Sequence, residues 1–335
     1  MSEAKSGSLY ETPFLGYRHG EGDGSTILPL VLNMECTATQ VEMNGNVAAT
    51  LARGYTPFVP YLMTKSGSVS ICGAGPSLSD TLDKLTGDVF AINSAIPYLI
   101  ERGIIPSWAM IWDCAEICTE FALPHTDVTY LVASRCHPKV FERLKDCKVV
   151  VWHACGDHNI LEYLEENKVI EPLVNGGTTG ITRGIYVAYA LGYRDFHIFG
   201  ADSAYKDGKT HAAGASLVYE HRLPVLMNGR WFESTPQWAA QIEEMKIMYP
   251  MFKSRGEAQM TAYDDGLFAW LMTIMKSDEA RALKDAEALI ELQMRQQGVA
   301  THGVPGCLPE GTIREIHEQA PHLVHDVMKT LERRA

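Results

Sequence analysis

Residues 174–214 decide the fold, and they read VNGGTTGITRGIYVAYALGYRDFHIFGADSAYKDGKTHAAG. A Gly/Thr loop opens this stretch. A segment rich in Ala, Tyr and Ile then runs to Gly192, where a helix C-terminus favours a left-handed residue. Residues 196–199, FHIF, follow as a short apolar strand that ends in Gly200-Ala201-Asp202. A loop, a helix and a strand in this order predict one unit of an open parallel sheet, which gathers polar groups at the carboxyl ends of its strands.

The same alternation of short apolar runs and helical segments extends over much of the chain. We expect strands at residues 69–72, 89–92, 108–112, 128–133, 148–152, 196–199 and 259–263. This pattern predicts an α/β fold, a Rossmann-like open parallel sheet of about six or seven strands with helices on both faces. Because the carboxyl ends of parallel strands share one edge, we expect a cluster of the polar residues that follow the strands: Asn93, Asp113, Ser134, His153 and Asp202.

Composition limits the function classes. The net charge is −12 and the sequence pI about 5.5, which disfavours a nucleic-acid partner because phosphate neutralisation needs clustered Lys and Arg. No apolar run approaches the roughly 20 residues of a membrane span, and the first residues lack the pattern of a signal peptide. The eight cysteines include no C-x-x-C pair, so buried thiols are favoured over a zinc site of Cys114, Cys118 and His137. We expect a cytoplasmic protein without a membrane partner.

We expect three parts in the chain. Residues 1–66 are an N-terminal extension, and its first 26 residues, rich in Gly and Ser, read as a surface arm. Residues 67–275 are the Rossmann-like domain. Residues 276–335 are a helical region with apolar positions at helical spacing, and its helices pack on the chain's own body or on a twin subunit in a homo-oligomer.

Two loops carry groups suited to binding and catalysis. The turn at residues 73–78, GAGPSL, follows the first strand, and its glycines allow backbone N–H groups to approach a phosphate. The turn lacks the third glycine of the dinucleotide fingerprint, so NAD is not indicated. The loop after residue 200 holds Asp202, Tyr205 and His211 as candidate catalytic residues. His211 has an ordinary pKa of about 6.5, which suits a general base near neutral pH.

These motifs resemble the MptE-like superfamily. The segments that carry the resemblance are GAGPSL (73–78), AINSA (91–95) and GADSAYKDGKTHAAG (200–214). The superfamily includes archaeal 6-hydroxymethylpterin diphosphokinases, motility-accessory-factor flagellin glycosyltransferases and phage-encoded members. The same segments are similar to bacterial lipooligosaccharide sialyltransferases. The resemblance implies that residues 67–275 form a nucleotide-binding catalytic domain, and that nucleotide contacts come from Gly73, Gly75, Pro76, Ser77, Asn93, Asp113, Thr178, Thr179 and Gly180.

Three differences from these families bear on the function. Ala74 stands where the sialyltransferases have Asn, and Tyr205 follows Asp202 by three residues instead of two. Of the acidic D-x-D that the diphosphokinases carry at the third strand, only Asp113 remains.

The resemblance implies glycosyl transfer from a nucleotide-activated sugar of the CMP type to an unidentified hydroxyl. His211 would be the base, and Tyr205, Lys209 or Arg183 would meet the charge of the leaving phosphate. The alternative is diphosphate transfer from ATP to a hydroxymethyl group, with Mg²⁺ held by Asp113 and Asp202. A third alternative is a non-catalytic nucleotide-binding or virion-assembly protein. Apart from Mg²⁺ in the second case, no cofactor is indicated.

Overall fold

The computed structural model describes residues 10–18, 27–32, 38–60, 65–155, 160–213, 222–256, 258–278 and 281. The chain divides into two compact units, Met1–Leu271 and Met272–Ala335, and the elements named below belong to the first. The predicted helical region 276–335 lies almost wholly outside the described residues. Within the described part of the chain, no helix is long and apolar enough to cross a membrane.

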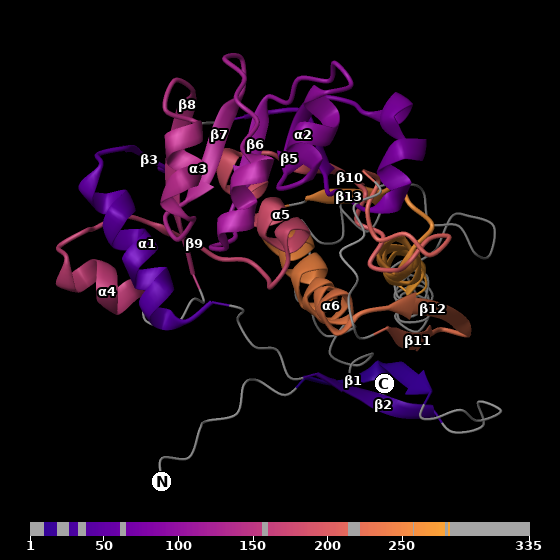
Figure 1. The fold of residues 1–335 in the computed structure, drawn as a ribbon. Helices are drawn as coiled ribbons and strands as arrows, with labels where there is room; N and C mark the ends of the chain where they lie inside the picture. The colour runs from indigo at the N-terminus through magenta and orange to yellow at the C-terminus, as the bar shows by residue number, and fades with distance from the viewer. Residues whose placement is uncertain are drawn as a thin grey trace, which may run out of the picture. The chain divides into compact units, whose positions relative to one another are not determined.

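A nine-stranded sheet forms the centre of the first unit (Figure 1), and every strand pairing in it is parallel. All residues of its inner strands β6 and β7 are buried, as expected when both faces of a parallel sheet are covered. The strands are β3 (Thr56–Pro57), β4 (Ser68–Cys72), β5 (Asp88–Ile92), β6 (Trp108–Ile111), β7 (Thr129–Ala133), β8 (Lys148–Ala154), β9 (Leu173–Val174), β10 (Asp195–Phe199) and β13 (Gln259–Ala262).

The strand order is β13-β10-β4-β5-β6-β7-β8-β3, with β9 also paired to β8. From β4 the chain advances to β8, passing through the short helices α2 (Ala95–Ile100) and α3 (Pro138–Arg143). It then returns through α5 (Gly180–Leu191) to β10, on the other side of β4. Because such crossovers are right-handed, the reversal puts α2 and α3 on one face and α5 on the other. The predicted open α/β sheet is confirmed. Its topological switch point, where the order of the strands reverses, lies between β4 and β10.

The predicted helix after the Gly/Thr loop is confirmed in detail. Thr179 is the N-cap of α5, and Gly192 ends the helix with a φ of 110°. Helix α6 (Pro236–Gly256) runs beside α5 (Figure 1). The ring of Phe252 in α6 packs 4.9 Å and 4.8 Å from the rings of Tyr186 and Tyr189 in α5. This contact fixes α6 against the helix that carries the Gly/Thr loop.

A second sheet is antiparallel, in the order β12-β11-β1-β2. It contains strand β2 (Ile27–Leu32) and the hairpin of β11 (Leu223–Met227) and β12 (Arg230–Ser234). The surface arm predicted for residues 1–26 is wrong for Tyr10–Arg18, which form β1 between β2 and β11. The local sequence did not reveal β1 because one of its two partners lies more than 200 residues further along the chain.

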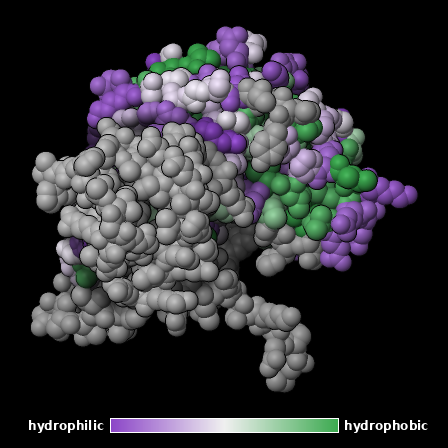
Figure 2. All heavy atoms as spheres, turned by 180° about the vertical axis from the view of Figure 1, so that it is seen from behind, coloured by the Kyte–Doolittle hydropathy of each residue, from purple (hydrophilic) through white to green (hydrophobic). Residues whose placement is uncertain are grey.

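Two short helical segments and one longer helix complete the first half of the chain. After the Gly turn the chain forms the 3₁₀ helices η1 (Pro76–Asp80) and η2 (Leu82–Lys84). Helix α1 (Gln40–Ala52) begins at a capping box of Thr39 and Glu42. Apolar residues of α1 and α4 (Ile160–Glu166) pack together, and Figure 2 shows apolar residues on the side of the molecule where these helices lie.

Candidate functional site

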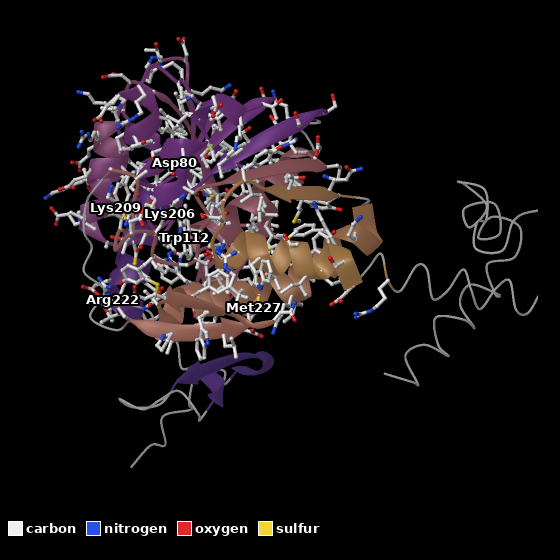
Figure 3. All side chains as sticks on the ribbon, turned by 90° about the vertical axis from the view of Figure 1, so that its right-hand side faces the viewer. Asp80, Trp112, Lys206, Lys209, Arg222 and Met227 are labelled. Atoms are coloured by element: carbon white, nitrogen blue, oxygen red, sulfur yellow. The ribbon has the colours of Figure 1, made fainter. Side chains whose placement is uncertain are left out.

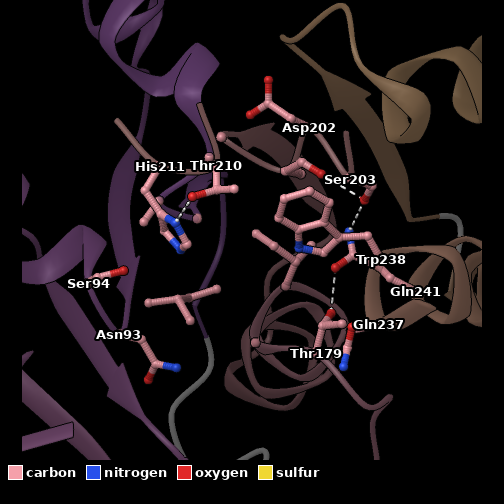
Figure 4. A pocket seen from close by; sticks show the side chains of 18 of the residues that line it. Asn93, Ser94, Thr179, Asp202, Ser203, Thr210, His211, Gln237, Trp238 and Gln241 are labelled. Carbon is pink, nitrogen blue, oxygen red and sulfur yellow. Dashed lines mark hydrogen bonds between the residues drawn. The ribbon is translucent and has the colours of Figure 1, made fainter. Parts of the chain in front are cut away.

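A pocket of about 300 Å³ opens at the carboxyl edge of the large sheet, at the switch point between β4 and β10 (Figure 4). Loops after four neighbouring strands supply one side of it, and α5 and α6 supply the other. Its walls are formed by Gly73–Gly75, Ile92–Ser94, Trp112, Asp113, Thr178–Ile181, Gly200–Ala204, Thr210, His211, Gln237, Trp238 and Gln241. Most of the predicted site residues thus surround one cavity.

Asp202 is a buried carboxylate directed at the Gly turn. The Ser77 hydroxyl donates to its Oδ2 at 2.9 Å, and the Ser77 N–H donates to both oxygens at 3.3 Å. Figure 4 shows the carboxylate turned away from the centre of the pocket. Burial raises the pKa of Asp202 to about 6, against these hydrogen bonds, which lower it. In this geometry Asp202 holds the Gly turn in place, and its oxygens are not presented to a ligand.

The glycines of the turn allow two loops to approach each other. A Cβ on Gly75 would overlap the Asp202 carboxylate and lie 2.6 Å from the Gly200 carbonyl oxygen. A Cβ on Gly73 would also lie 2.6 Å from that oxygen. Space for a phosphate was the expected reason for glycine at position 75, but the atoms that exclude a side chain there belong to the protein.

The N-terminus of α5 offers backbone donors to the pocket. The N–H groups of Gly180 and Ile181 lie in the first turn, where no intrahelical acceptor exists, and both residues line the cavity. The N–H of Thr178 is already used, since it donates to the Glu244 carboxylate of α6 at 2.7 and 2.9 Å. Burial raises the pKa of Glu244.

Gln241 of α6 joins the two loops that border the pocket. Its amide nitrogen donates to Ser203 Oγ at 2.9 Å, and its carbonyl oxygen accepts from Thr179 Oγ1 at 2.6 Å. Gln241 is 3 % exposed. The side chain therefore fixes the distance between the loop after β10 and the N-cap of α5.

Asn93 faces this helix terminus from the end of β5. Its φ of 46° is left-handed, a conformation that Asn adopts more readily than most residues other than glycine. Its Oδ1 is buried and has no hydrogen-bond partner among the described residues. A buried acceptor without a donor is costly, so the arrangement suits a ligand that supplies the donor.

His211 lies across the pocket from α6 (Figure 4). Its Nδ1 is 2.9 Å from Thr210 Oγ1, and Nε2 has no partner among the residues that the structure describes. Burial lowers the pKa of His211. The next residue is tied to the Gly turn, because the Ala212 N–H donates to the Ala74 carbonyl at 2.9 Å. The imidazole is therefore neutral at pH 7 and held in a fixed place.

Some predicted residues do not reach the pocket wall. Pro76 and Ser77 are buried behind the Gly turn. Tyr205 is not part of the wall and packs against Trp238, with its ring 5.4 Å from the indole. Arg183 is 4 % exposed and donates to the Cys155 and Val174 carbonyls, with its guanidinium over Trp112.

The lysines of this loop lie at its surface. Lys209 is exposed, and Lys206 pairs with Asp80 at 3.1 Å and with Asp265 at 3.4 Å. Figure 3 shows both lysines near Asp80. In this structure, Tyr205 and Arg183 do not present a charge to a phosphate in the pocket.

Ser134 and His153, expected in the same cluster, form a separate network further along the sheet edge. His153 Nδ1 lies 2.8 Å from Ser134 Oγ, and Nε2 lies 3.0 Å from Glu171 Oε2. Tyr55 donates to the other Glu171 oxygen at 2.9 Å. His153 is 1 % exposed. These residues join the segment before β9 to the sheet.

Sequence reasoning missed several residues of this region. Asp264 follows the last strand, β13, so the rule that found Asp202 could have found it. Asp202 and burial together raise its pKa to about 7. The others come from α6, and no motif marks them: Gln237, Trp238, Gln241 and Glu244.

The residues present do not fit the metal site expected for diphosphate transfer. Asp202, one of its two expected ligands, is taken by Ser77. Asp113 accepts from the Ala115 N–H at 3.4 Å through Oδ1 and is the other carboxylate of the wall. Among the described residues, no group of three His, Cys, Asp or Glu is placed to hold a metal ion.

Comparison with known proteins identifies the central segment. Residues 46–208 match the family model described as 6-hydroxymethylpterin diphosphokinase MptE-like, which confirms the predicted resemblance over these residues. The curated proteins contain no match to the chain. The similarity to sialyltransferases and to phage-encoded members stays a prediction.

Two solved structures show only weak similarity. A cycloalternan-forming enzyme from Listeria monocytogenes in complex with a pentasaccharide substrate is 12% identical, with a TM-score of 0.16. An uncharacterised protein from Listeria monocytogenes EGD-e is 11% identical, with the same TM-score. In both cases the alignment covers 75% of this chain and 25% of the other. At these TM-scores neither similarity carries an argument.

Proposed function

We propose that this chain, whose residues 46–208 match the MptE-like family, is a nucleotide-dependent transferase. We further propose that it transfers a glycosyl group from a nucleotide-activated sugar of the CMP type to a hydroxyl acceptor. The observation that supports this most is the cavity at the switch point, where the N–H groups of Gly180 and Ile181 lie across from Asn93 and His211. Such a helix terminus favours a phosphate.

Glycosyl transfer needs a base for the acceptor hydroxyl and a group that stabilises the negative charge of the leaving phosphate. In the proposed reaction the acceptor hydroxyl loses its proton to His211 Nε2 as its oxygen bonds to the anomeric carbon, and the bond from that carbon to the phosphate oxygen breaks. The phosphate leaves with the bonding electron pair, and the N–H groups of Gly180 and Ile181 stabilise its charge. Tyr205 and Arg183, earlier candidates for that role, are placed elsewhere.

Diphosphate transfer from ATP to a hydroxymethyl group is the second candidate, and the description of the matching family favours it. It is placed second because the carboxylate pair expected to hold Mg²⁺ is incomplete, with Asp202 bonded to Ser77.

Thermal unfolding with CMP, CMP-sugars and ATP, each with and without Mg²⁺, tests the proposal. A ligand at 100 times its Kd stabilises the fold by about 2.7 kcal/mol. We expect CMP to raise the unfolding temperature without Mg²⁺. Product analysis by mass spectrometry then follows CMP release from CMP-sugars. Stabilisation by ATP and Mg²⁺ alone, with AMP as product, would support the second candidate, and binding without turnover would indicate the non-catalytic alternative.

A further inference from the structure

One wall of the pocket has no role in the proposed reaction. It is the first turn of α6, where Gln237 and Trp238 face the cavity. We propose that this wall is a subsite for a planar heterocyclic ring with hydrogen-bonding edges, which stacks on the indole of Trp238. The inference rests on the proposed function, and it names the class of ligand that the pocket takes: a nucleobase or an acceptor ring of the same chemistry.

The indole is held at a fixed angle to the pocket. The Tyr205 ring packs against it edge to face, with the ring planes at 65°, and the guanidinium of Arg222 lies 4.4 Å from the centre of the Tyr205 ring. The backbone N–H of Trp238 donates to Thr235 Oγ1 at 3.2 Å, which fixes the start of the helix. Tyr205 is not part of the pocket wall, whereas Trp238 is. Figure 4 shows the indole opposite His211.

A rigid aromatic side chain on a cavity wall provides apolar area at a small cost in conformational entropy. Stacking of a base on such a ring is worth about 1–3 kcal/mol. The pocket's volume of about 300 Å³ lies at the lower end of the range for small-molecule sites. The cavity therefore suits a single ring system together with the group attached to it.

Two polar groups of the cavity wall suit the edge of such a ring. Gln237, next to Trp238 on α6, is exposed and bonds to no described residue. Asn93, on the opposite wall (Figure 4), has a buried Oδ1 without a hydrogen-bond partner among the described residues. Gln241, the next amide on this face of α6, has both ends bonded within the protein. Gln241 therefore shapes the wall, while the side chains of Gln237 and Asn93 are available to form hydrogen bonds with a ligand.

The test compares ligands that carry a ring with one that does not. Calorimetry with the full chain measures the affinity for cytidine, adenosine, 6-hydroxymethylpterin, CMP, ATP and inorganic diphosphate. Trp238→Ala removes the aromatic ring on which the ligand would stack, and Trp238→Phe keeps an aromatic ring. Trp231→Ala is the matched control, because Trp231 lies on β12 outside this pocket and is 39% exposed.

We expect Trp238→Ala to weaken the ring-bearing ligands roughly 5- to 150-fold and to leave diphosphate unchanged. Trp238→Phe should recover most of the loss, and Trp231→Ala should change nothing. A higher affinity for a nucleoside than for the pterin would show that the ring is a nucleobase, and the reverse would show that it belongs to the acceptor. The inference is overturned if Trp238→Ala weakens diphosphate equally, if the ring ligands bind the variant as well as the wild type, or if the wild type binds no ring ligand. Ring binding that depends on Trp238 without any transfer would reject the proposed function and keep the subsite.

Discussion

At the scale of single residues, His211 combines a fixed position with a neutral imidazole. Burial lowers its pKa, so the ring is ready to accept a proton at pH 7. We expect His211→Ala to lower kcat by about 10²–10⁴ and to leave nucleotide affinity nearly unchanged. The wild-type kcat/KM should rise with pH through a pKa below 6.5.

Steady-state kinetics and calorimetry measure the two effects of this substitution. His125→Ala is the control, since His125 lies in the loop before β7 and its ring accepts from the neighbouring Asp127 N–H, away from the pocket. If His211→Ala weakens nucleotide binding while kcat stays constant, His211 is a phosphate ligand and the base lies elsewhere.

Asp264 should make stability depend on pH. Burial and the neighbouring Asp202 raise its pKa to about 7 in the folded chain, from an ordinary value near 3.8. Because the folded pKa is the higher one, the stability that the protonated group contributes is complete below about pH 4 and is lost as the pH rises through 7. Asp264→Asn should therefore raise the free energy of unfolding at pH 8 by up to about 4 kcal/mol, with little effect at pH 4.

Urea denaturation at the two pH values checks this expectation. Asp265→Asn is the matched control, since the Asp265 side chain is 67% exposed and pairs with Lys206. Equal effects of Asp264→Asn at pH 4 and pH 8 would contradict the assignment.

Single strand-end residues show how far the sequence alone leads. Asn93, Asp113 and Asp202 meet at one pocket because each follows a strand of one parallel sheet, and this rule needs no knowledge of packing. The direction of a side chain is different. That Asp202 turns toward Ser77 depends on the close approach of two loops, which the glycines at 73 and 75 permit.

At the scale of elements, α6 sets the geometry of the Gly/Thr loop. Its Glu244 accepts from the Thr178 N–H and, at 3.2 Å, from the Thr182 hydroxyl. The contact could not be predicted from sequence, because it depends on how α6 packs along α5 through Phe252. Pro236 marks the start of α6 in the sequence, but no local pattern indicates which helix α6 packs against.

Removing the Glu244 carboxylate should loosen that loop. Glu244→Ala removes the hydrogen bonds that the Thr178 N–H and the Thr182 hydroxyl make to the carboxylate, and a hydrogen bond to a charged group is worth about 1.5–3 kcal/mol. We expect nucleotide affinity to fall as well, because the loop continues into the α5 terminus. Glu244→Gln keeps one acceptor oxygen and should retain most of both. Urea denaturation and calorimetry give the two values, and an unchanged affinity in Glu244→Ala would show that the α5 terminus is held without this contact.

At the scale of the whole molecule, the carboxyl edge of the sheet divides into two regions. The pocket lies at the switch point between β4 and β10, while Ser134 and His153 lie at β7 and β8, toward the other end of the strand order. There the network ends on Tyr55, just before β3, and on Glu171, just before β9. The rule that polar strand ends cluster holds along the whole edge, but it does not distinguish a ligand site from a structural junction.

Burial separates the two regions. The side chains of His153 and Ser134 are each 1% exposed, so a ligand has no access to them. Burial lowers the pKa of His153. The neutral ring donates from Nε2 to Glu171 and accepts the Ser134 hydroxyl at Nδ1, a tautomer assigned from the hydrogen bonds. The network therefore stabilises the end of the sheet and takes no part in the proposed reaction.

His153→Ala should lower stability and spare the site. The change leaves the buried Ser134 hydroxyl without its partner, at a cost of about 1–3 kcal/mol, and removes one hydrogen bond from the partly buried Glu171 carboxylate. Nucleotide affinity should stay within twofold of the wild type. Urea denaturation and calorimetry on the same preparation test both parts, and His211→Ala should show the opposite pattern, with stability kept and turnover lost. A loss of nucleotide affinity in His153→Ala that exceeds the loss expected from unfolded protein would show that the two regions of the edge are coupled.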